Sequence, residues 1–309
     1  MRVTVTEAND ATSTIPARQN EPAFQRLLKA RQWRWAVAVR WQKAQLALVL
    51  TPPAIALLFG SIYPEIKPWI AFFAVGSTLL DVALFDRAYK AALKAGARAS
   101  EFFDCQLLQL DWNSVVAGKQ PSPEETDRAA HGWDQLRKKG PIVDWYSSDV
   151  NRVSHGLARV ICQRTNLTYD SDLRKLYRTI LDISVLLMAL TVLGIGLLST
   201  QKFPDFVLST WVPTAPFFIW ALRERFRQAD AVQSNDPVIT EAEKLISAVI
   251  AGSCDDGACK MQSRLLQDAI FYRRANTVLL FPGIYKIRRK NAEREMRAGA
   301  AHWVEKAGK

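Results

Sequence analysis

The feature that most constrains this sequence is a set of four long apolar segments, arranged as two pairs. The first pair covers residues 44–63 and 68–85, and the second covers residues 183–201 and 206–222. Each segment approaches the length of roughly 17 to 25 residues that a helix needs to cross a hydrocarbon core about 30 Å thick. A short loop closes each pair. The sequence therefore predicts two membrane hairpins.

The alternative is that these segments are buried helices of a soluble protein. The mean hydropathy is −0.06, and 23% of the residues are charged, which is typical of a globular chain. The charges lie almost wholly outside the four segments, however, whereas helices in soluble cores alternate polar and apolar faces with a period near 3.6. This segregation favours the membrane interpretation.

Basic residues flank both hairpins on the outside, while the two hairpin loops contain only Lys67 and Lys202. By the positive-inside rule the loops face outward, and both termini are cytoplasmic. We expect a multi-pass protein of the cell inner membrane. Much of the net charge of +11 then sets the topology and does not indicate direct DNA or RNA binding. The flanking residues are Arg26, Lys29, Arg31, Arg34, Arg40, Lys43, Arg87, Lys90, Lys94, Arg98, Arg174, Lys175, Arg178, Arg223, Arg225 and Arg227.

Outside the hairpins, helical spacing dominates and strand-like alternation is scarce, so the predicted fold class is all-α. Residues 122–125 form a favourable helix start, and a helix break is expected near Asn235–Asp236–Pro237. The predicted organisation is a disordered tail at 1–20, a basic interfacial helix at 21–43, transmembrane hairpins at 44–85 and 183–222, and cytoplasmic helical segments at 86–182 and 223–309.

Signatures of enzymes are missing from the sequence. It contains no Gly-rich phosphate loop, no G-x-S-x-G and no H-E-x-x-H motif. The three histidines are scattered, and Cys254 and Cys259 are spaced more widely than a Cys-x-x-Cys metal site. We expect no catalytic residues, no metal and no cofactor.

Polar and helix-distorting residues inside the spans indicate a pore or gate. Asp81 lies within the second span, where a carboxylate is costly unless it faces a partner, water or another subunit. Whether it lines a pore or a helix interface, or is simply hydrated near the membrane surface, stays open. Pro52, Pro53 and Pro213 can kink their helices, which would suit a gated assembly, although such residues are also common in membrane helices that never move.

Several clusters outside the spans combine aromatic, amide and basic side chains. Aromatic rings can stack on a base, arginine binds phosphate oxygens bidentately, and amides or carboxylates can read the edge of a base. The chemistry suits a nucleotide ligand, although such clusters also serve as helix caps and packing contacts. They occupy residues 111–113, 144–146, 162–166, 267–268 and 271–274.

These clusters, in their order around the two hairpins, resemble the SMODS-associated four-transmembrane effectors of bacterial anti-phage signalling, a CBASS-like system. The resemblance covers nearly everything after residue 20. The matching motifs are Glu101–Phe102–Phe103–Asp104–Cys105, Leu110–Asp111–Trp112–Asn113, Asp144–Trp145–Tyr146, Cys162–Gln163–Arg164–Thr165–Asn166, Leu173–Arg174–Lys175–Leu176–Tyr177, Leu266–Gln267–Asp268–Ala269–Ile270–Phe271 and Arg273–Arg274.

The resemblance implies a partner synthase of the CD-NTase type that makes a cyclic oligonucleotide during infection. It also implies an effector that senses this messenger and permeabilises the inner membrane, giving abortive anti-phage defence. We expect messenger contacts among Trp145, Tyr146, Arg164, Asn166 and Arg274. The spans are expected to form a homo-oligomer in the lipid bilayer, for example a tetramer, because so few polar residues lie within them.

Two other classes of function remain possible at this point. One is a constitutive ion channel, broadly like the bestrophins, that needs no nucleotide. The other is a membrane scaffold that recruits a protein partner. The span count permits both, but neither explains the aromatic and basic clusters.

Overall fold

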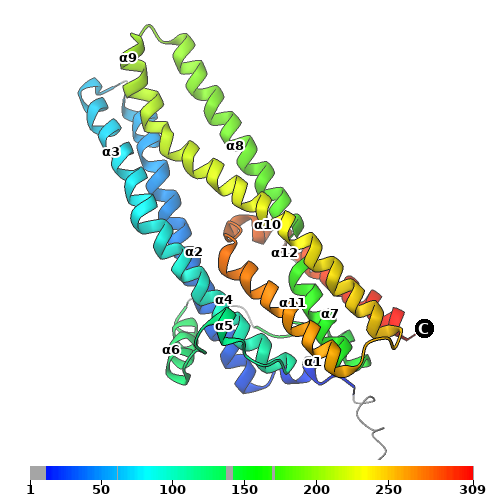
Figure 1. Ribbon diagram of the computed structural model, residues 1–309. Coiled ribbons are helices and arrows are strands. Elements are labelled where there is room, and N and C mark those ends of the chain that lie inside the picture. Colours follow the sequence, from blue (N-terminus) through cyan, green and yellow to red (C-terminus); the bar gives the residue numbers. More distant parts are fainter. Residues whose placement is uncertain (1–11, 61, 137–141, 169–170, 309) are drawn as a thin grey trace, which may run out of the picture.

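A computed structural model describes residues 12–60, 62–136, 142–168 and 171–308. Over these ranges the chain is helical apart from connecting loops and an isolated antiparallel bridge between Thr12 and Ser154. Two long hairpins extend together from a domain of shorter helices, here called the extramembrane domain (Figure 1). The all-α prediction is confirmed.

The first hairpin pairs one uninterrupted helix with a return arm that contains a π-turn. Helix α2 joins the predicted interfacial helix and the first span into one element. The π-turn begins at Asp81, and such turns are often found at functional positions. The elements are α2 (Pro22–Phe59), η1 (Pro64–Ile66), α3 (Lys67–Leu80), η2 (Asp81–Phe85) and α4 (Asp86–Leu108).

The second hairpin has the same plan, with a π-turn again in its return arm. Its elements are α8 (Ser171–Leu198), α9 (Phe203–Phe206), η4 (Val207–Trp211) and α10 (Val212–Ile250). Four helical stretches of the described chain are long and apolar enough to cross a membrane. Large apolar side chains such as Phe72 and Leu198 are exposed on the hairpins, as expected for surfaces that lipid covers. The four-span prediction is confirmed.

The predicted helix break near Asn235–Asp236–Pro237 is wrong, because α10 continues through Pro237 to Ile250. The side chain of Asn235 is buried, and its amide donates a hydrogen bond to the Leu167 carbonyl at 3.5 Å. This contact and the packing of α10 on α7 hold the helix together. Tertiary contacts here outweigh the local tendency of proline to end a helix.

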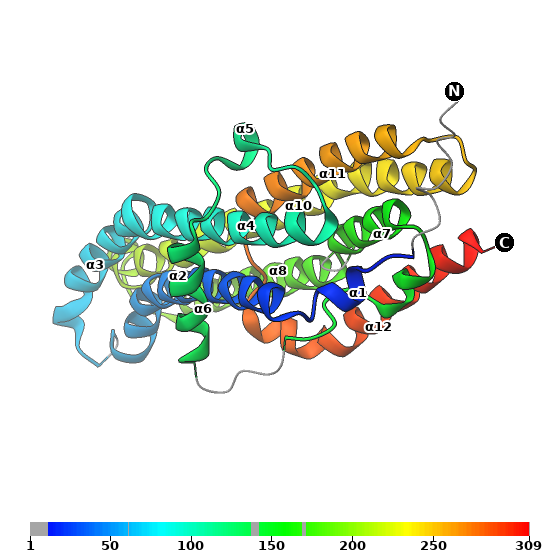
Figure 2. The same ribbon diagram turned by 90° about the horizontal axis from the view of Figure 1, so that it is seen from below.

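The extramembrane domain surrounds one apolar core. Fully buried residues include Phe103, Leu107, Ile161, Ile246 and Ile270, which come from four different helices. Helix α11 packs against α4, α7 and α10, and it runs beside α10 in Figure 2. The additional elements are α1 (Ile15–Arg18), α5 (Ser114–Ala117), α6 (Pro123–Asp134), η3 (Ser148–Arg152), α7 (His155–Thr168), α11 (Asp256–Asn276) and α12 (Pro282–Ala307).

Part of the segment expected as a disordered tail is ordered in the structure. Ile15 in α1 is fully buried in the core, and the side chain of Gln19 exchanges two hydrogen bonds with the backbone of Tyr146. A single apolar residue in a polar stretch gives too weak a pattern to predict this docking. Residues 1–11, the rest of the expected tail, lie outside the described ranges.

Candidate functional site

The extramembrane domain contains a buried polar network centred on Asp104 of α4. The carboxylate accepts hydrogen bonds from the Tyr146 hydroxyl at 2.8 Å, the Arg274 guanidinium at 2.5 Å and the Gln267 amide at 3.3 Å. Asp104 is 0% exposed, and a buried carboxylate requires such pairing. One side chain therefore connects α4, α11 and the loop that precedes η3.

A second part of the network lies about one turn earlier on α4. Glu101 accepts hydrogen bonds from Arg264 at 2.5 Å and from Gln267 at 2.8 Å. Gln163 of α7 donates to the Gln267 side chain at 3.1 Å and accepts from the Ser263 hydroxyl at 2.6 Å. Ser263 and Gln267 are four residues apart, so they share one face of α11. This face is bonded to both α4 and α7.

Three of the five residues predicted to bind a messenger meet in this network. The Asn166 amide donates to the Tyr146 hydroxyl at 2.8 Å, and Tyr146 and Arg274 both donate to Asp104. The structure therefore brings Tyr146, Asn166 and Arg274 together. Their polar groups are engaged with one another and with Asp104.

The other two predicted residues lie apart from this network. The ring of Trp145 lies 3.9 Å from the guanidinium carbon of Arg31. Arg164 points to the far side of α7, where it forms a salt bridge with Glu243 at 2.6 Å and lies 5.7 Å from the centre of the Trp303 ring. Its side chain is partly exposed. Arg164 and Asn166 lie two residues apart on α7, so their side chains point to nearly opposite sides of the helix, and this spacing already indicated that they do not share one site.

Burial and charge fix the protonation states at the centre of the network. Burial, reinforced by the Asp104 charge, raises the pKa of Tyr146 well above its usual value. Burial lowers the pKa of Arg274, but the adjacent Asp104 carboxylate outweighs this effect, and the net pKa is raised. Tyr146 is therefore a neutral donor, and Arg274 is a permanent cation.

Arg159 of α7 is a buried cation that the sequence analysis missed. It is 4% exposed, and within the described ranges it has no salt bridge, while its Nε and Nη2 atoms have no hydrogen-bond acceptor. A Cβ atom added at Gly156 would lie 3.4 Å from Asp256 Oδ1, 3.9 Å from the Cys259 sulfur and 4.0 Å from Nη2, so a carboxylate, a thiol and this guanidinium line one small space. The available signal was an arginine inside the apolar run of residues 157–161. A buried cation is costly unless an anion lies near it, and the Asp256 carboxylate borders this space.

Between the hairpins, Asp81 is paired with two side chains from other helices. It accepts a hydrogen bond from Gln45 of α2 at 2.5 Å and forms a salt bridge with Arg223 of α10 at 2.5 Å. Asp81 is 3% exposed. Of the interpretations left open by the sequence, the structure therefore shows a helix interface. A second ion pair, Arg227 with Asp86 at 3.0 Å, lies nearer the extramembrane domain.

The three prolines expected at a gate are also buried. Pro52 and Pro53 lie within α2, and Pro213 lies in the first turn of α10, next to the π-turn η4. Each lacks the N–H that would bond to the preceding turn, so the helices carry weakened positions where the two hairpins face each other. These positions are where a rearrangement meets the least backbone resistance.

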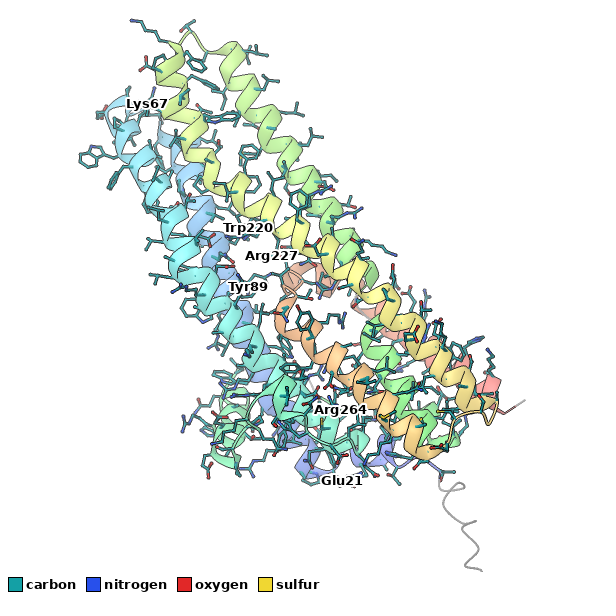
Figure 3. All side chains as sticks on the ribbon, viewed as in Figure 1. Glu21, Lys67, Tyr89, Trp220, Arg227 and Arg264 are labelled. Carbon is teal, nitrogen blue, oxygen red and sulfur yellow. The ribbon has the colours of Figure 1, made fainter. Side chains whose placement is uncertain are left out.

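The connector between α11 and α12, residues Thr277–Phe281, is the largest feature that the sequence analysis missed. Its backbone is bonded to one side chain from each of the four long helices. The donors and acceptors are Gln42 of α2, Tyr89 of α4, Arg174 of α8 and Gln228 of α10. Figure 3 labels Tyr89, whose hydroxyl accepts the hydrogen bond from the Leu279 N–H. A sequence signal existed, since these polar residues lie just beyond apolar spans.

The arrangement of two hairpins and a helical domain agrees with a known family. The SMODS-associating 4TM effector domain matches residues 13–303. This chain belongs to that family. A protein of Bacillus cereus (strain VD146) named "Probable CBASS effector molecule" is 25% identical over 233 residues, which cover 73% of this chain and 75% of that protein. No solved structure matches the chain. The resemblance seen in the sequence is confirmed, and the chain is a membrane effector of CBASS antiviral defence.

Across the described residues, no group of three or more His, Cys, Asp or Glu side chains could hold a metal ion. Cys254 and Cys259 flank the start of α11, where the Asp255 side chain caps the helix by accepting from the Ala258 N–H at 2.8 Å. The stretch between the two cysteines therefore begins a helix.

Proposed function

We propose that this effector senses a cyclic oligonucleotide with its extramembrane domain and then permeabilises the bacterial inner membrane. The observation that best supports this is the position of α11. This helix contributes Arg274 to the buried network, and the connector that follows it is bonded to all four long helices. A ligand that prefers a shifted α11 would therefore act on every span, because binding moves an equilibrium toward the preferred state.

The proposed messenger contacts are the five predicted residues together with Arg159. Arg164 and Trp303 offer a partly exposed guanidinium beside an aromatic ring, a combination that suits a phosphate next to a base. Arg159 supplies a buried cation whose Nε and Nη2 atoms have no hydrogen-bond partner in the described structure. Tyr146 and Arg274, which donate to Asp104, and Asn166, which donates to the Tyr146 hydroxyl, would respond by rearranging these hydrogen bonds.

Variants at the three arginines test this assignment. Arg164→Ala and Arg159→Leu are expected to weaken nucleotide binding about tenfold or more while leaving the thermal unfolding temperature nearly unchanged, since neither removes a buried ion pair. Arg274→Ala is expected to lower both the affinity for the nucleotide and the thermal unfolding temperature. Isothermal titration of the purified protein with cyclic di- and trinucleotides measures affinity. Unchanged affinity in all three variants would remove the assignment.

The proposed topology places both termini and the extramembrane domain in the cytoplasm, where a CD-NTase-like synthase would supply the messenger. Arg223, Arg225 and Arg227 follow the last span on this side, as the positive-inside rule requires. Homo-oligomers in the lipid bilayer, for example a tetramer, complete the proposal. Thiol labelling of a cysteine added to either hairpin loop, in intact cells and spheroplasts, tests the orientation.

Dye release from liposomes tests the function itself. Purified protein is reconstituted around a trapped fluorescent dye, and cyclic di- and trinucleotides are added singly at micromolar concentration. We expect one nucleotide to trigger rapid release, while linear dinucleotides and empty liposomes serve as controls.

Two other results would contradict the proposal. Release at the same rate with and without every nucleotide would indicate the constitutive channel. No release under any condition, from protein that binds a nucleotide, would show that sensing leads to another output.

A further inference from the structure

The connector Thr277–Phe281 is an extended segment that lies between the two hairpins. Its ends have extended backbone angles, with φ −94° and ψ 131° at Thr277 and φ −61° and ψ 132° at Phe281. Val278 and Leu279 pack with an apolar cluster of the first hairpin that includes Leu93. Leu280 and Phe281 pack against a cluster drawn mainly from the second hairpin. Apolar contacts thus attach the connector to both hairpins.

Four polar side chains satisfy the backbone of this segment. The Leu279 N–H donates to the Tyr89 hydroxyl at 2.7 Å, and the Leu279 carbonyl accepts from Gln42 at 2.9 Å and from Gln228 at 3.4 Å. Arg174 donates to the Val278 carbonyl at 3.0 Å. An extended peptide among apolar side chains needs such partners, because its own groups cannot bond to each other.

From the connector toward the hairpin loops, buried polar side chains continue along the contact between the two hairpins, here called the seam. Gln45, Asp81 and Arg223 form the bonded group described above, and Thr214 and Ser77, whose hydroxyls donate to carbonyls of the preceding turn, lie buried farther toward the loops. Buried polar side chains within membrane helices are expensive and mark ion or substrate pathways. The seam therefore has the chemistry of a path for ions, and the connector lies at its end nearest the extramembrane domain.

We propose that residues 277–281 are a plug that closes this seam and holds the two hairpins together. The inference rests on the proposed function, in which the protein permeabilises the membrane, and it assigns the element that controls release. The plug leaves the seam when α11 moves. The last turn of α11 directly precedes the plug and is held by two contacts. Arg273 donates to the Asn166 carbonyl at 2.7 Å, and Arg274 donates to Asp104. A messenger that changes these contacts is expected to displace Thr277, the first residue of the plug.

Two variants with side chains of nearly the same size are expected to loosen the plug, because each removes one hydrogen bond without leaving a cavity. Tyr89→Phe removes the acceptor of the Leu279 N–H, and Gln42→Leu removes a donor to the Leu279 carbonyl. In the liposome assay without nucleotide, each is expected to raise dye release about three- to tenfold, the factor that corresponds to losing one hydrogen bond of ordinary strength. The double variant should release faster than either single variant.

Matched controls lie at exposed positions. Tyr63→Phe removes a hydroxyl from an exposed ring in the loop of the first hairpin, and Thr51→Val removes a hydroxyl that bonds only to its own helix. Neither should change release. Circular dichroism and size-exclusion profiles confirm that each variant is folded.

Hydrogen exchange gives a readout that does not depend on release. Peptides covering residues 277–281 should exchange faster in Tyr89→Phe than in the wild type, and also in the wild type with the nucleotide that triggers release. Wild-type release in both plug variants, with unchanged exchange of this segment, would overturn the plug. If no nucleotide increases dye release from the wild type while Tyr89→Phe releases dye without nucleotide, the result supports the plug and contradicts nucleotide sensing.

Discussion

Replacing Asp104 with alanine is expected to lower the stability of the extramembrane domain by about 3 to 5 kcal/mol, the usual consequence of removing one partner from a buried ion pair. The change leaves the Arg274 guanidinium in the core without its carboxylate and deprives Tyr146 and Gln267 of an acceptor. Thermal unfolding of the detergent-solubilised protein, followed by circular dichroism, measures the loss. Nucleotide binding should disappear with it.

The matched control is an aspartate in an exposed ion pair. Asp127 pairs with Arg26 across α6 and α2, and both side chains are more than half exposed. Asp127→Ala should therefore change stability by about 1 kcal/mol at most. Equal unfolding temperatures for the two variants would show that the Asp104 network contributes no more than a surface contact.

Replacing Arg223 with glutamine is expected to destabilise the packing of the two hairpins, again by about 3 to 5 kcal/mol. Asp81 would lie buried between the helices with only the Gln45 amide as a partner. The unfolding temperature in lipid nanodiscs should fall, and dye release without nucleotide should rise because the hairpins separate more easily.

The double variant Asp81→Asn, Arg223→Gln separates loss of pairing from loss of side-chain contact. It converts the ion pair into an uncharged pair that can still form a hydrogen bond, and Gln45 keeps an oxygen acceptor. Most of the stability lost in Arg223→Gln should return. A double variant as unstable as the single one would mean that Arg223 stabilises the seam by means other than neutralising Asp81.

Local signals in the sequence were sufficient for the helices and their starts. The predicted start at residues 122–125 is confirmed, because the Ser122 hydroxyl accepts from the Glu125 N–H at 3.1 Å. Such capping involves neighbours in the chain and is visible in the sequence. Pro237 is the counterexample, since the contacts that keep α10 intact come from α7, a segment far away in sequence.

The candidate site was only partly predictable. Motif chemistry selected Tyr146, Asn166 and Arg274, which do meet in space, but it also selected Arg164, which faces Glu243 on the other side of α7. Residue type reports what a side chain can bind. Spacing within α7 shows that Arg164 and Asn166 point to opposite sides, but which neighbours each side meets depends on how the helices pack.

The sequence by itself determined the all-α class, the four spans and the family, because hydropathy and charge act along the chain and remain legible without a fold. Only the tertiary structure decided that Asp81 is paired with Arg223, that Asp104 joins α4 to α11 and to the loop before η3, and that Thr277–Phe281 enters the seam. Each of these depends on partners from separate helices. Burial makes such pairing obligatory, but it does not specify from the sequence which partners will meet.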